Sequence, residues 1–184
     1  MAKPKLIILN GAPGAGKSTL AERYADEHPL TLHMDIDDIR MHISHWRELN
    51  EQSGPMAKNM VAAMIRIHLQ SGHDVIVPQI YRKTKYLEEL EQIAREADAD
   101  FYEILLFAEK DEALKHFIER GKREGYPTGF RPGDIIDREG REQKLASMND
   151  EMMAVVAKRP NTIRVQVIAN YINCIYRQLL DAIS

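Results

Sequence analysis

Hydrophobic residues gather in five short runs along the chain, separated by longer segments in which apolar positions recur every three or four residues. Continuous apolar runs are typical of strands that are buried on both faces of a parallel sheet. The spacing of three and four is typical of helices with one apolar face. We therefore predict five strands: Lys5–Asn10, Leu30–Met34, Val75–Val77, Phe101–Ala108 and Ile163–Ile168.

Seven further segments are predicted to be helical. The first of them ends before His28-Pro29, because the residue before a proline avoids the α conformation. A polar stretch, Asn50–Pro55, is predicted to separate the second helix from the third. One stripe of the third helix is expected to face the core: Met56, Met60, Met64 and Ile67. The predicted helices are Lys17–Glu27, Ile39–Trp46, Met56–Gln70, Thr84–Ala97, Asp111–Glu119, Glu142–Lys158 and Ile172–Ile183.

The alternation of strands and helices implies a parallel sheet that is covered by helices on both faces. We expect residues 1–184 to form a single domain. Within it, the stretch Arg120–Arg141 is rich in glycine, proline and arginine and has little apolar pattern. Such a stretch is typical of a mobile loop, so we predict a lid over approximately residues 120–141.

Composition limits the classes of partner. Hydrophobic residues make up 44% of the chain and charged residues 29%, which is normal for a globular protein. The formal net charge is -3, so no basic excess drives nonspecific binding to nucleic acid or membrane. No apolar run approaches the ~20 residues of a membrane span. A lone cysteine, Cys174, cannot form an internal disulfide. We therefore expect a cytoplasmic protein with no membrane partner.

The most informative segment follows the first predicted strand. It reads GAPGAGKST and satisfies the pattern G-x-x-x-x-G-K-[ST] of a phosphate-binding loop (P-loop), between a strand and a helix as the motif requires. Glycines let the backbone turn its N–H groups inward as a nest for phosphate oxygens, and the helix that follows adds its positive end. The residues predicted to bind the nucleotide here are Gly11, Ala12, Pro13, Gly14, Ala15, Gly16, Lys17, Ser18 and Thr19.

Two side chains of this loop have specific expected roles. Lys17 supplies a positive charge to the β- and γ-phosphates, so it is also predicted to be catalytic. The hydroxyl of Ser18 is a predicted ligand of Mg²⁺. ATP and Mg²⁺ are therefore the expected cofactors.

A cluster of acids follows the second predicted strand. The segment Asp35–Arg40 reads DIDDIR and belongs at the carboxyl edge of the sheet, where ligands bind in open α/β folds. A carboxylate there can take the proton of an acceptor hydroxyl or help to hold a metal ion. We expect Asp35 and Asp37 to be functional, with Asp35 as a metal ligand. Asp38 is nearest to the predicted helix start and is expected to cap it.

The segments GAPGAGKST and DIDDIR together resemble a family of P-loop kinases that includes polynucleotide 5′-hydroxyl kinases, zeta toxins, chloramphenicol phosphotransferase and gluconate kinase. Beyond these two segments the resemblance covers only the order of strands and helices. It implies that Asp37 is the base toward the acceptor hydroxyl and that Arg40 contacts substrate or phosphate. It also implies that arginines of the lid close over ATP: Arg120 and Arg123 in catalysis, and Arg131 in nucleotide binding.

One feature departs from this resemblance. Many of the related kinases end the third strand with an acidic residue, whereas this strand runs into Pro78-Gln79. We expect Asp35 or Asp37 to take over the magnesium role, or Gln79 to contact substrate. Arg82, at the rim of the same edge, is a further candidate for substrate contact.

The fold class predicted from these observations is an α/β P-loop NTPase fold, a three-layer α/β/α sandwich with a five-stranded, mostly parallel sheet and a small lid. The predicted function is that of an ATP-dependent kinase, which transfers the γ-phosphoryl group to a hydroxyl of a small-molecule or nucleotide-like acceptor. A P-loop ATPase or nucleotide-binding switch without such an acceptor remains the alternative. A nucleic-acid end is a less favoured acceptor, because the chain is slightly acidic.

Overall fold

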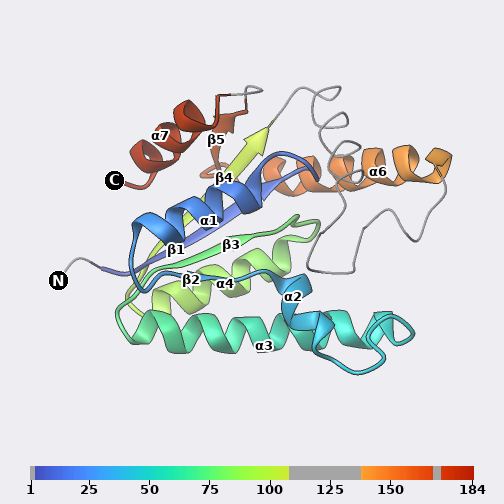
Figure 1. The fold of residues 1–184 in the computed structure, drawn as a ribbon, viewed down its shortest axis with the longest axis horizontal. Coiled ribbons are helices and arrows are strands. Elements are labelled where there is room, and N and C mark those ends of the chain that lie inside the picture. Colours follow the sequence, from blue (N-terminus) through green and yellow to red (C-terminus); the bar gives the residue numbers. More distant parts are fainter. Residues whose placement is uncertain (1–2, 108–137, 168–170) are drawn as a thin grey trace.

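The computed structural model describes residues 3–107, 138–167 and 171–184. Its strands form one sheet in the order β2-β3-β1-β4-β5, and every neighbouring pair is parallel (Figure 1). The five predicted strands are therefore confirmed, and the sheet is wholly parallel. The strands are β1 (Lys5–Gly11), β2 (Leu32–His33), β3 (Val75–Pro78), β4 (Asp100–Phe107) and β5 (Ile163–Gln166).

Helices cover both faces of the sheet, which gives the predicted three layers. In Figure 1, α1 and α7 lie over one face, and α3 and α4 lie over the other. Helix α6 packs on the same side as α4, where its Val155 joins the core of that face. The helices are α1 (Lys17–Glu27), α2 (Ile36–Met41), α3 (Asn50–Gln70), α4 (Thr84–Glu96), α6 (Arg138–Ala157) and α7 (Ile172–Ala182).

The apolar run Leu6–Leu9 of the central strand β1 is explained by the helices on both faces of the sheet. Leu6 and Ile8 point into the core under α3 and α4, whereas Ile7 and Leu9 point into the core under α1 and α7. All four side chains are fully buried. Successive residues of a strand face opposite sides, so a strand between two helical layers has no polar face.

The predicted core stripe of α3 is wrong. Met56, Met60, Met64 and Ile67 are 48%, 47%, 38% and 69% exposed. A second stripe with the same helical spacing is buried instead: Ala57, Val61, Ile65 and Leu69. Both stripes satisfy the periodicity, and the buried one has the smaller side chains overall. Small and β-branched residues let the helix lie close to its neighbours in the core, which the size of methionine does not favour.

The predicted break at Asn50–Pro55 is also wrong, since these residues form the first turns of α3. Contacts of Ser53 outweigh the helix-breaking tendency of the Gly54-Pro55 pair. Ser53 is buried, its Oγ donates to the carbonyl of Trp46 at 2.8 Å, and its N–H donates to the carbonyl of Leu49 at 2.8 Å. Asn50–Pro55 therefore belongs to α3.

Other boundaries also differ from the prediction. Helix α2 begins three residues before the predicted Ile39, β2 is two residues long, and α6 begins at Arg138 rather than Glu142. The predicted helix Asp111–Glu119 and most of the predicted lid fall outside the described residues. Within the part of the chain that the structure covers, no helix has the length and apolar character needed to cross a membrane.

Candidate active site

The loops that follow β1, β2 and β3 share the carboxyl edge of the sheet, because the three strands are parallel neighbours in the order β2-β3-β1. The P-loop follows β1, the DIDDIR segment follows β2, and the segment Gln79–Lys83 joins β3 to α4. Ligands of open α/β sheets bind at this edge. The fold thus brings three separate stretches of sequence to one place.

The glycines of the P-loop are required by its backbone. Gly14 and Gly16 have φ of 87° and 83°, in the left-handed region that glycine adopts without strain. Gly11 is required by a close approach, since a Cβ there would lie 2.6 Å from the carbonyl oxygen of Leu106 on β4. The N–H of Ala15 donates to the carbonyl of Ala12 at 3.1 Å and closes the turn. The predicted tight turn is present.

The P-loop leads directly into α1. Gly16 is the N-cap residue and offers no side chain to the first-turn amides, which have no partner within the helix. The N–H of Leu20 donates to the Gly16 carbonyl at 3.0 Å and begins the helical pattern. Lys17 Nζ donates to the carbonyls of Gly11 at 2.8 Å and Ala12 at 2.9 Å. This geometry holds the ammonium group against the loop, beside the positive end of α1.

Asp35, and not Asp38, caps the helix after β2. Its side chain accepts a hydrogen bond from the N–H of Asp37 at 2.8 Å, while Asp38 is exposed in the first turn of α2. The capping residue differs from the predicted Asp38 because α2 begins at Ile36, earlier than the apolar pattern indicates. Burial raises the pKa of Asp35 to about 6, against the hydrogen bond from Asp37 and the charge of Lys17.

Asp37 lies in the first turn of α2 and is only partly exposed. Burial raises its pKa, and the positive charges of Arg40 and Lys58 oppose that rise. A partly desolvated carboxylate with a raised pKa is a stronger base than an exposed carboxylate. The structure therefore places Asp37 in an environment that fits a general base.

Arg40 is engaged with the start of α3. Its Nε donates to Ser53 Oγ at 3.0 Å, and its terminal nitrogen donates to the backbone carbonyl of Asn50 at 3.0 Å and to the Asn50 side chain. The guanidinium also lies over the Trp46 ring, 5.3 Å from its centroid. These contacts fasten the corner between α2 and α3. The predicted contact of Arg40 with substrate or phosphate remains a prediction.

Asn10 is a site residue that the sequence reasoning missed. It is fully buried at the end of β1, and its Oδ1 accepts from the N–H of Gly11 at 2.9 Å and from the N–H of Tyr81 at 3.1 Å. One amide side chain therefore joins the first residue of the P-loop to the segment after β3. The only signal in the sequence was a polar residue at the end of an apolar run.

At the end of β3, where many related kinases have an acidic residue, this chain has Pro78 and Gln79. Pro78 is buried as the last residue of the strand, and the N–H of Gln79 donates to the carbonyl of Leu9 at 3.0 Å. The Gln79 side chain accepts from the next backbone N–H, that of Ile80, at 3.1 Å. Gln79 thus stabilises its own turn.

The donors at this edge suit magnesium. A serine hydroxyl and one or two carboxylates are hard oxygen donors, and Mg²⁺ in phosphoryl-transfer sites takes few protein ligands besides water and phosphate. Ser18, at the start of α1, and Asp35, at the tip of β2, supply such donors. Over the described residues, no cluster of three or more His, Cys, Asp or Glu side chains offers a metal site formed by protein alone. The predicted lid residues Arg120, Arg123 and Arg131 lie beyond the described part.

Comparisons with known proteins place the chain in a family. Residues 6–131, more than half of the chain, match the family AAA_33, described as an AAA domain. An adenylate kinase from Deinococcus radiodurans is 30% identical over 132 residues, covering 66% of this chain and 67% of that protein. An L-seryl-tRNA(Sec) kinase from Methanococcus maripaludis is 30% identical over 122 residues. That match covers 64% of this chain and 47% of the relative, so the chain spans about half to two thirds of these proteins.

The fold agrees with this placement. A gluconokinase from Sinorhizobium meliloti 1021 superposes with a TM-score of 0.62 at 19% identity, over 99% of this chain and 93% of the other. The named relatives are kinases, which agrees with the resemblance of the sequence to P-loop kinases. The chain belongs to the AAA_33 family of P-loop kinases.

Proposed function

We propose that the chain is an ATP-dependent kinase that transfers the γ-phosphoryl group to a hydroxyl of a small-molecule or nucleotide-like acceptor. The observation that carries this proposal is the placement of a complete P-loop and a partly buried carboxylate, Asp37, at one edge of the sheet. Phosphoryl transfer needs mainly positioning and neutralisation of charge, and both are available there.

The proposed roles follow from position. The amides of Gly11–Thr19 and the ammonium of Lys17 bind the β- and γ-phosphates. Ser18 and Asp35 would hold a magnesium ion, which would supply further positive charge to offset that of the phosphates. Arg40 and the lid arginines are proposed to steady the transferring group, Arg40 from its place one helical turn after Asp37.

The proposed reaction is an in-line displacement. The acceptor oxygen forms a bond to the γ-phosphorus while the bond from that phosphorus to the β–γ bridging oxygen breaks, and ADP leaves. The proton of the acceptor hydroxyl passes to the carboxylate of Asp37. The raised pKa of Asp37 favours this transfer, because a carboxylate with a higher pKa is a stronger base.

A screen of ATP consumption across hydroxyl-bearing metabolites tests the proposal. Asp37→Asn should lower kcat by about 100-fold or more, which is the usual contribution of a general base. Asp38→Asn is the matched control, because Asp38 is the neighbouring exposed acid and makes the same change of charge. Lys17→Ala should abolish turnover with every acceptor, because it removes the charge that binds the phosphates.

The same screen separates this proposal from the alternative of a P-loop ATPase or switch. A kinase consumes ATP faster when its acceptor is present and forms a phosphorylated product. ATP consumption that no acceptor accelerates would favour the ATPase, in which water is the only nucleophile. Full transfer activity in Asp37→Asn would show that Asp37 is not the base.

A further inference from the structure

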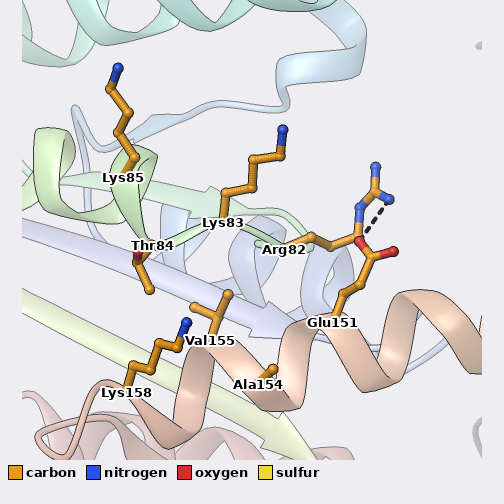
Figure 2. Close-up of a pocket in the computed structure, with 8 residues that line it drawn as sticks. All are labelled: Arg82, Lys83, Thr84, Lys85, Glu151, Ala154, Val155 and Lys158. Carbon is orange, nitrogen blue, oxygen red and sulfur yellow. Dashed lines mark hydrogen bonds and ion pairs between the residues drawn. The ribbon is translucent and has the colours of Figure 1, made fainter.

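A pocket of about 360 Å³ lies between the segment after β3 and helix α6 (Figure 2). It is rich in cations, with one carboxylate, that of Glu151, among its lining residues. Its apolar wall comes from Ala154 and Val155 of α6. Four cationic side chains line it: Arg82, Lys83, Lys85 and Lys158.

The positive charge in this pocket is not balanced. The carboxylate of Glu151 lies 3.1 Å from Arg82 and so neutralises one of the four cations. Within the described part of the chain, Lys83, Lys85 and Lys158 form no ion pair. The start of α4 also lines the pocket, and its N-cap residue, Lys83, makes no side-chain hydrogen bond to the first-turn amides. A helix start of this kind attracts anions.

A further cation, Lys58 of α3, does not line this pocket but contacts the first residues of α4. The Nζ of Lys58 lies over the Tyr86 ring, 5.2 Å from its centroid, and the Tyr86 hydroxyl donates to the Lys58 carbonyl at 3.2 Å. Lys58 therefore lies beside the first turns of α4. Burial lowers the pKa of Lys58, and the charges of Arg82 and Lys83 lower it further, while Asp37 raises it. The charges of Arg82, Lys83 and Asp37 thus all act on the ammonium group of Lys58.

Asn10 joins the segment that carries Arg82 and Lys83 to the P-loop. Its side chain binds the N–H of Gly11 in the P-loop and the N–H of Tyr81, the residue before Arg82. The backbone of the segment that carries Arg82 and Lys83 is therefore joined to the P-loop. An acceptor whose charged group binds these cations would lie at the edge of the sheet that also carries Asp37 and the P-loop.

From these observations we infer that Lys58, Arg82 and Lys83 bind a phosphate group carried by the acceptor. The inference rests on the proposed kinase function, since it names the class of acceptor. A phosphate dianion has three oxygens that can accept hydrogen bonds from several ammonium groups and from the amides at a helix start. An acceptor with a carboxylate offers only two such oxygens and one charge, so it fits these donors less well. A small phosphorylated compound fits better than a polynucleotide, because a polymer needs a basic track along its backbone and the chain is acidic overall.

Paired acceptors test this inference. ATP consumption is measured with glycerol and glycerol 3-phosphate, with ribose and ribose 5-phosphate, and with a 5′-hydroxyl oligonucleotide. A phosphorylated member of a pair should be the better acceptor by at least tenfold in kcat/KM. Equal or better activity with the unphosphorylated members, or preference for the oligonucleotide, would overturn the inference while leaving the kinase proposal intact.

Substitutions of single lysines test which side chains bind the phosphate group of the acceptor. Lys83→Gln and Lys58→Gln should each raise KM for the phosphorylated acceptor by about tenfold, the usual effect of losing one charge-assisted hydrogen bond, and leave KM for ATP unchanged. Lys3→Gln is the matched control, because Lys3 is an exposed lysine that pairs with Asp98 far from this edge. An unchanged acceptor KM in both Lys83→Gln and Lys58→Gln would refute the assignment.

Binding can be measured even if no compound is turned over. With the P-loop filled by a non-hydrolysable ATP analogue and magnesium, glycerol 3-phosphate is titrated while the amide resonances of Thr84 and Lys85 are followed by NMR. Saturable shifts that disappear in Lys83→Gln support the pocket. Absence of shifts overturns it. Binding without any transfer would instead count against the proposed kinase function alone.

Discussion

Substituting Gly11 by alanine tests the geometry of the P-loop directly. The added Cβ would lie 2.6 Å from the carbonyl oxygen of Leu106, 3.3 Å from the Leu106 Cβ and 3.4 Å from the Ala15 Cβ. The oxygen belongs to the backbone of β4, which pairs with β1 at this position, so it cannot rotate away. To reach an ordinary contact distance, the two strands must separate by several tenths of an ångström.

The expected cost follows from that displacement. Overpacking a well-packed site by one methyl group typically costs about 1–3 kcal/mol of unfolding free energy. Gly11→Ala should therefore lower the free energy of unfolding by roughly this amount, and it should weaken ATP binding because the start of the P-loop moves. Urea denaturation followed by circular dichroism gives the first quantity, and calorimetric titration with Mg·ATP gives the second.

Gly54→Ala is the matched control. It also adds one methyl group, but the nearest atom to that Cβ would be Arg40 Cζ at 3.9 Å, an ordinary contact. Gly54 lies inside α3, where alanine is favoured over glycine by about 0.5–1 kcal/mol. The two substitutions should therefore change stability in opposite directions. Wild-type stability and wild-type ATP affinity in Gly11→Ala would refute the close approach of β1 and β4 on which the reasoning depends.

Three further predictions concern buried polar groups. Asp35→Asn keeps a residue that can cap α2. At pH values above 6 this variant should have a free energy of unfolding higher than that of the wild type by at most about 3 kcal/mol, and below pH 3.8 the two should differ little. The sign follows because burial raises the folded pKa from 3.8 to about 6, so the ionised form is the disfavoured one. Denaturation at several pH values measures this. Arg159→Met leaves the buried carboxylate of Glu103 without its charged partner and should cost about 3–5 kcal/mol in thermal or urea unfolding, a loss that Arg159→Met/Glu103→Leu should largely reverse. Asn10→Leu leaves two buried N–H groups unpaired and should cost about 2–4 kcal/mol by the same measurement.

The sequence was sufficient to predict those parts of the structure that depend on short-range conformational preferences. The glycines of the P-loop favour a tight turn, and the apolar run of β1 favours a buried strand. Both elements were predicted correctly. Helix α3 shows where such rules end. Its two apolar stripes have the same periodicity, and the choice between them depends on how closely the helix approaches the sheet. That distance is a property of the packed molecule.

The candidate site divides in the same way. The P-loop and Asp37 belong to continuous motifs, so sequence reasoning could find them. The cations Lys58 and Lys83 could not be connected in this way, because Lys58 lies in α3 and Lys83 lies just before α4, and only tertiary packing brings α3 and the start of α4 together. The role of Asn10 likewise depends on β1 and β3 being neighbours in the sheet.

The chemistry at the end of β3 connects these observations. A carboxylate there would repel an anionic acceptor, but this strand ends in Pro78, and Gln79 uses its side chain to hold its own turn. The first charged groups after the strand are therefore Arg82 and Lys83. Because Asn10 joins this segment to the P-loop, we expect its positive charge to act on an acceptor that binds beside the nucleotide. Under the proposed assignment, the missing acid and the cations Lys58, Arg82 and Lys83 would both favour an acceptor that carries negative charge.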